Sequence, residues 1–109
     1  MTSNIEEFTV CLNEQRFYDA HEALEEIWFP RRFEDDSEMK LLKGFINASV
    51  SFELFKKDKK TQSKKVWNNY LKYRPLLYKV ESIHTNKYHS IARQIESINT
   101  KNHYLKEDI

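Results

Sequence analysis

The chain contains a single glycine, Gly44, among its 109 residues. Hairpin turns and β-bulges depend on glycine for positive φ angles, so a sheet of several strands would need several glycines. The loops that hold the phosphates of dinucleotides and nucleoside triphosphates need two or three glycines within a few residues. The glycine count therefore argues against both classes of protein and favours helices.

Apolar residues recur at helical spacing in five segments. The expected helices cover residues 3–13, 17–29, 37–56, 66–80 and 87–99. Pro75 interrupts the fourth of these, so a kink or break is expected near Tyr73. Segment 37–56 is apolar on most of its circumference, which is the pattern of a central helix. The sequence predicts an all-α fold, a compact bundle of four to five helices around this segment.

Length and composition limit the kind of protein further. We expect residues 1–109 to form a single helical domain, whose polar tail frays after about residue 100. The single cysteine, Cys11, excludes an intramolecular disulfide and a cysteine-based zinc site. The start of the chain lacks the features of a secretion signal, and no stretch approaches the ~18 apolar residues of a membrane span. These features predict a cytoplasmic protein with no membrane partner.

The one compact cluster of candidate chemistry lies in segment 17–29. At 100° per residue, His21 falls in the apolar arc of this helix together with Trp28, and Glu25 lies on its border. Residues four apart face the same way, so His21 and Glu25 can contact each other or jointly hold a metal ion. We expect His21 to be buried against Trp28 and to share a hydrogen bond with Glu25.

Three other acids differ in their expected positions. Glu22 and Glu26 point to the solvent side of the same helix. Glu53 falls within the apolar sector of segment 37–56, and an acid in that position needs a polar partner. We therefore expect Glu53 to project towards His21 and Glu25.

Three interpretations of the pair formed by His21 and Glu25 stay open. The pair can be a partly buried hydrogen-bonded pair without further function, because a buried imidazole needs partners. It can bind a divalent metal ion, with further ligands from Glu53, another histidine or a second subunit, since one helix supplies only two of the four ligands that structural sites use. It can take part in general acid–base catalysis, but the sequence shows no nucleophile or complete catalytic constellation, which argues against an enzyme.

The net charge of +1 hides a strong polarity along the chain. Residues 1–54 carry 5 basic and 12 acidic side chains, whereas residues 55–109 carry 13 and 5. Such asymmetry is typical of a nucleic-acid-binding half or of two halves that pack through complementary faces. The best nucleic-acid footprint is a run of lysines at positions 56, 57, 59, 60, 64 and 65. Because the chain is near neutral and the run lacks arginine, any nucleic-acid affinity should be weak and non-specific.

The alternative function is therefore an interaction module, which would use the basic C-terminal half on nucleic acid or on a protein partner. A homo-oligomer is also compatible with the sequence.

The segment Phe17–Trp28, followed by Leu42–Ser49, resembles the domain-of-unknown-function 309 family. The hallmark of this family is His-x-x-x-Glu-x-x-Trp, in a chain that then reads roughly Leu-Gln-Gly-Leu-Ile-Gln-Leu-Ala. His21, Glu25 and Trp28 match the hallmark without a gap. The resemblance covers about residues 8–74. It implies a small helical bundle of a bacterial protein, with a polar pocket and a metal-binding role for the His/Glu motif.

Overall fold

The computed structural model describes residues 1–102 and 104–105, and in this part of the chain all regular structure is helical. The α-helices are α1 (Thr2–Asn13), α2 (Phe17–Trp28), α3 (Ser37–Lys56), α4 (Lys60–Tyr73) and α5 (Thr85–Asn102). Two short 3₁₀ helices, η1 (Phe29–Arg31) and η2 (Arg74–Tyr78), directly follow α2 and α4. The predicted all-α fold is confirmed. Among the helices described, none combines the length and the apolar character that crossing a bilayer requires.

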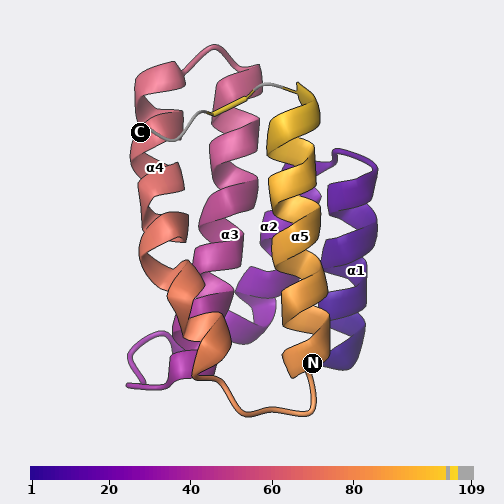
Figure 1. Cartoon of the computed structure of the whole chain (residues 1–109), viewed down its shortest axis with the longest axis vertical. Coiled ribbons are helices and arrows are strands. Elements are labelled where there is room, and N and C mark those ends of the chain that lie inside the picture. Colours follow the sequence, from indigo (N-terminus) through magenta and orange to yellow (C-terminus); the bar gives the residue numbers. More distant parts are fainter. Residues whose placement is uncertain (103, 106–109) are drawn as a thin grey trace.

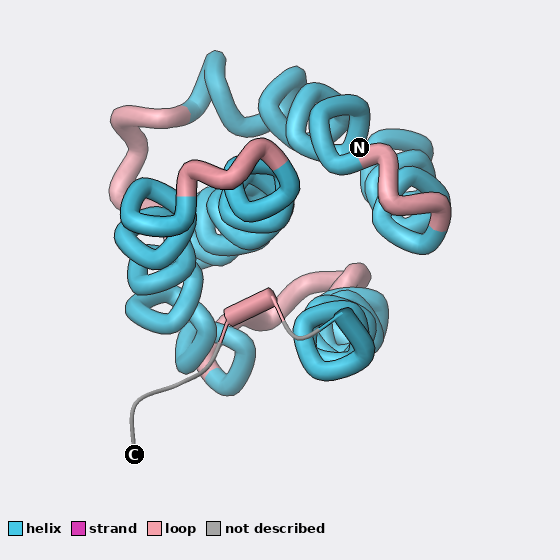
Figure 2. Tube along the Cα trace, turned by 90° about the horizontal axis from the view of Figure 1, so that it is seen from above, coloured by secondary structure: helices cyan, strands magenta, loops and turns pink. Residues whose placement is uncertain are grey.

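Helix α3 lies at the centre of the bundle, as its apolar circumference predicts (Figures 1 and 2). The hairpin of α1 and α2 packs on one side of it, α4 packs along another, and α5 closes the remaining side. The ring of Phe45 in α3 lies 6.0–6.5 Å from the rings of Phe8 in α1, Tyr70 in α4 and Tyr88 in α5. The core is therefore built outward from α3.

Gly44 allows α3 and α4 to approach closely. A Cβ atom at Gly44 would lie 2.9 Å from the Cβ atom of Tyr73, a separation that real structures essentially never show. The φ angle of Gly44 is not positive. Among the residues that the structure describes, the two positive φ angles belong to Gln15 (58°) and Asp58 (61°), in the turns after α1 and α3. Polar residues thus take the left-handed turn positions, although with more strain than glycine, and the one glycine serves helix packing.

The helix boundaries differ from the expected ones mainly in the C-terminal half. Helix α4 ends at Tyr73, where Pro75 forces a 3₁₀ turn, so the predicted break is confirmed. The helix begins at Lys60, several residues before the expected start, because its lysine-rich first turns carry little apolar pattern.

The polar tail expected to fray after about residue 100 lies partly outside the described residues. In the part that is described, α5 continues to Asn102. Beyond it, the ring of Tyr104 packs 5.2–6.2 Å from the rings of Phe17, Phe52 and Phe55.

A partly buried carboxylate–hydroxyl contact joins the start of α5 to α3. The carboxylate of Glu38 accepts hydrogen bonds from the hydroxyl groups of Ser82, at 2.8 Å, and Tyr88. Burial raises the pKa of Tyr88 far above its usual value, and the neighbouring Glu38 raises it further. The phenol therefore stays protonated and donates to the carboxylate.

Replacing Gly44 with alanine tests the close approach of α3 and α4. In an open helix, Gly→Ala stabilises by roughly 0.5–1 kcal/mol, but here the added methyl group meets the Cβ atom of Tyr73. We expect Gly44→Ala to destabilise the protein by about 1–3 kcal/mol in urea unfolding, the usual range for overpacking.

The control is the double variant with Tyr73→Gly, which removes the opposing Cβ atom at the last residue of α4. In that background Gly44→Ala should be neutral or stabilising. Equal destabilisation in both backgrounds would contradict the steric explanation.

Candidate functional site

Helix α2 carries the candidate site on the border between its buried and exposed faces. Phe17, Ala20 and Leu24 are buried and fix the helix against its neighbours. His21 and Glu25 lie beside this buried face and are half-buried, with side-chain exposures of 23% and 36%. This intermediate position keeps both side chains accessible while the helix that holds them is fixed.

The structure brings His21 and Glu25 together, one helical turn apart. The Nε2 atom of His21 pairs with a carboxylate oxygen of Glu25. Glu22 joins them, because one ligand atom from each of the three side chains lies within 4.8 Å of the other two. The three side chains are called the α2 cluster below.

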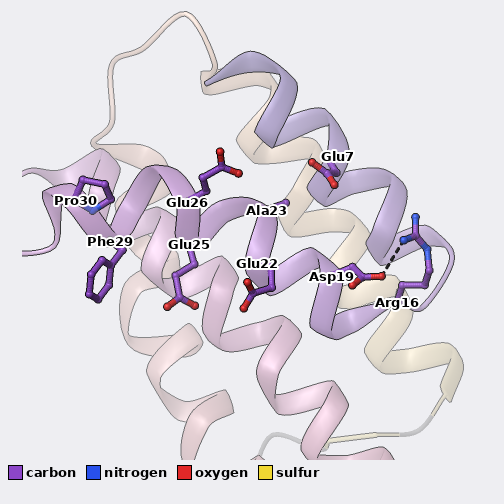
Figure 3. A pocket seen from close by; sticks show the side chains of 9 residues that line it. All are labelled: Glu7, Arg16, Asp19, Glu22, Ala23, Glu25, Glu26, Phe29 and Pro30. Atoms are coloured by element: carbon purple, nitrogen blue, oxygen red, sulfur yellow. Dashed lines mark hydrogen bonds and ion pairs between the residues drawn. The ribbon is translucent and has the colours of Figure 1, made fainter.

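Glu22 is exposed, as expected, but its carboxylate lies beside His21 and Glu25 and not on the opposite side of α2. Figure 3 shows Glu22 and Glu25 pointing to the same side of the helix and Glu26 pointing away. Residues three apart on a helix are neighbours, so a long exposed carboxylate at position 22 reaches the side chain at position 25. In the sequence, the spacing of three residues between Glu22 and Glu25 could have indicated that their side chains are neighbours.

His21 is half-buried, not buried as predicted. Its imidazole ring lies edge to face with the ring of Tyr18, at a centroid distance of 5.9 Å and an interplanar angle of 88°. Trp28 follows two turns later, about 10 Å along the helix axis. It packs partly against the core, and its ring lies 5.8 Å from the Nζ atom of Lys43. His21 and Trp28 share a side of α2 but lie at different heights along it.

Glu53 faces the same region from α3. A small cavity of about 210 Å³ lies between the two helices, with Tyr18 and His21 on one wall and Glu53 and Lys57 on the other. The carboxylate of Glu53 pairs with the Nζ atom of Lys57 at 3.0 Å. The polar partner of Glu53 is therefore the lysine that directly follows α3, and Glu53 is not one of the three grouped ligands.

Glu22 and Glu25 also border an open groove between α1 and the α2–η1 segment (Figure 3). Its walls carry five carboxylates, from Glu7, Asp19, Glu22, Glu25 and Glu26. The guanidinium of Arg16 offsets part of this charge at one end, where it pairs with Asp19 at 2.9 Å. The helical pattern of each segment did not reveal this acidic groove, because the pattern does not show which polar faces of two helices meet.

Comparison with known proteins places the chain in a family. The family model described as Domain of unknown function (DUF309) matches residues 5–66. The chain belongs to this family. No curated protein and no solved structure matches it. The DUF309 match includes the α2 cluster and the whole of α3, whereas η2 and α5 lie beyond it.

Double-mutant cycles test which polar partners act together at this site. The contact between His21 and Glu25 predicts a coupling energy of about 0.5–1 kcal/mol between His21→Ala and Glu25→Gln in urea unfolding. Because Glu53 pairs with Lys57, His21→Ala and Glu53→Gln should be additive within about 0.3 kcal/mol. A larger coupling of His21 with Glu53 than with Glu25 would contradict this assignment of partners.

Proposed function

We propose that the α2 cluster binds a divalent metal ion of the zinc type. The observation that carries the proposal is the grouping of one imidazole nitrogen and two carboxylate oxygens within 4.8 Å of one another. Ligands of such an ion lie ~2.0–2.2 Å from it, so two of them are at most ~4.4 Å apart. The separation of up to 4.8 Å in the cluster exceeds this limit only slightly. A small rotation of the exposed Glu22 side chain would bring its carboxylate within ligand distance.

The chemistry of the three side chains supports this class of ion. Imidazole with carboxylates is a common donor set for zinc and for neighbouring transition metals. His21 Nε2 already lies against a carboxylate oxygen of Glu25, so an ion between them would take the place of a shared proton. The edge-to-face contact with Tyr18 restricts the orientation of the His21 ring, which reduces the cost of ordering this ligand.

The accessibility of the cluster favours a binding site that is open to further ligands. Structural zinc sites are closed by four protein ligands, whereas three protein ligands leave positions for water or a substrate. An ion held here would supply a Lewis acid next to the cavity that contains Glu53 and Lys57. We assign metal binding to this site and no reaction.

We further propose that the chain is a cytoplasmic bacterial protein and that it folds as one helical domain. The single cysteine, Cys11, is free and buried, which fits a reducing compartment.

Titration calorimetry with Zn²⁺ on protein without a histidine tag tests the metal site. We expect one site per chain, and at least tenfold weaker binding for His21→Ala and for Glu25→Gln, since each removes a ligand. Binding should also weaken as the pH is lowered, because the imidazole and the carboxylates bind metal only when unprotonated.

Two matched controls remove the same groups elsewhere. His89→Ala removes a half-buried histidine of α5, and Glu26→Gln removes a carboxylate from the other side of α2. Both should bind Zn²⁺ like the unmodified protein. Absence of binding, or equal binding by the His21→Ala variant, would refute the proposal.

A second candidate function is nucleic-acid binding through α4. Lys60, Lys64 and Lys65 line a shallow surface together with Thr61 and Asn68. Because α3 lies between α4 and the α1–α2 hairpin, this basic surface is separated from the acidic groove. Lysine contacts to phosphates supply affinity without base recognition.

Titration with duplex and single-stranded oligonucleotides at about 150 mM salt tests this candidate. We expect dissociation constants in the micromolar range or weaker, without sequence preference. Lys64→Gln together with Lys65→Gln should weaken the binding, whereas Lys87→Gln on α5 should not. Tight, sequence-dependent binding would make nucleic acid the principal ligand.

A further inference from the structure

A second open cavity lies between η2 and α5, outside the DUF309 match and without any residue of the α2 cluster. Its volume of about 670 Å³ falls within the range of small-molecule sites. Leu77 and Ala92, both almost fully buried, contribute apolar surface to its walls. Apart from Pro75, the remaining lining residues are charged or aromatic.

The two arginines of this cavity differ in their partners. Arg74 of η2 pairs with the carboxylate of Glu96 of α5 and so joins the two walls. Arg93 is exposed and lies one helical turn after His89, so both face the cavity from the same side of α5. Arg93 forms no ion pair with any residue that the structure describes, so its guanidinium is the cation that this cavity can offer to an anion.

The aromatic group is Tyr78, which is 82% exposed although it follows directly on the buried Leu77. Its ring lies 5.8 Å from the ring of His89, at an interplanar angle of 61°. The contact holds the tyrosine beside the cavity and leaves most of its surface uncovered. An uncovered ring in this position offers a stacking surface to a planar group.

We propose that this cavity binds a nucleoside monophosphate. The base would stack on Tyr78, and the phosphate would accept charge-assisted hydrogen bonds from Arg93, whose planar guanidinium matches phosphate geometry. Glu96 supplies an acceptor for ribose hydroxyl or exocyclic amino groups. The cationic donor, Arg93, and the stacking ring, Tyr78, thus both line one cavity of suitable size. Binding at this cavity is independent of metal binding at α2.

Titration calorimetry with AMP on the full chain tests the site. AMP should bind at least tenfold more tightly than adenosine or inorganic phosphate, because each of these retains only one of the two contacts. Arg93→Gln should weaken AMP binding about tenfold or more through loss of a charged hydrogen bond. Tyr78→Leu should weaken it about fivefold or more through loss of stacking. Both residues are exposed, so neither change should affect folding.

Lys87→Gln is the matched control, because it removes one positive charge from α5 outside the cavity. It should leave AMP affinity unchanged within twofold. If AMP binds no more tightly than phosphate, recognition of the base is refuted. If Arg93→Gln and Lys87→Gln weaken binding equally, the site is refuted in favour of a general charge effect. Absence of AMP binding refutes the proposal as a whole.

Discussion

The burial of α3 on nearly all sides is the constraint on which the other helices depend. Phe45 contacts rings from three other helices, and Gly44 lets α4 approach without a side chain between the backbones. Since interiors are packed as densely as organic crystals, each neighbour of α3 has little freedom to shift. The half-buried position of His21 at the edge of α2 follows from this packing.

The two proposed ligand sites share one physical origin. Each lies where a helix leaves the core and its polar edge meets another element: α2 beside α3 and α1, and α5 beside η2. Such edges hold charged groups in fixed positions while water and ligands still reach them. The two sites differ in their charged groups, because the α2 edge carries several carboxylates, whereas the cavity beside α5 is lined by one arginine from each of its two walls and one carboxylate. The charge polarity of the sequence thus becomes a difference between two surfaces of one bundle.

Most features that depend on one helix could be predicted from the sequence, the position of Glu22 being an exception, whereas those that depend on two helices could not. The bounds of α3 and the pairing of His21 with Glu25 follow from spacing within one segment. The pairing of Glu53 with Lys57 competes with a partner on another helix, and periodicity does not decide between them. The acidic groove and the cavity beside α5 depend on how helices are placed relative to one another. The packing of Tyr104 depends on rings from α2 and α3, so the polar sequence of the tail did not predict it.

The attachment of α5 by Glu38 has a consequence for the order in which the protein folds and opens. Helices α1 to α4 pack mainly against neighbours in sequence, contacts that form fast because little loop entropy is lost. Helix α5 must instead close long loops, through Tyr88 with Glu38 and through Gln94, whose amide donates to the carbonyl oxygen of Thr9 at 2.9 Å. We therefore expect α5 to dock last and to detach first in a partial unfolding event. A ligand held between η2 and α5 would slow that detachment, so occupancy of the cavity and protection of the α5 amides from hydrogen exchange would rise together.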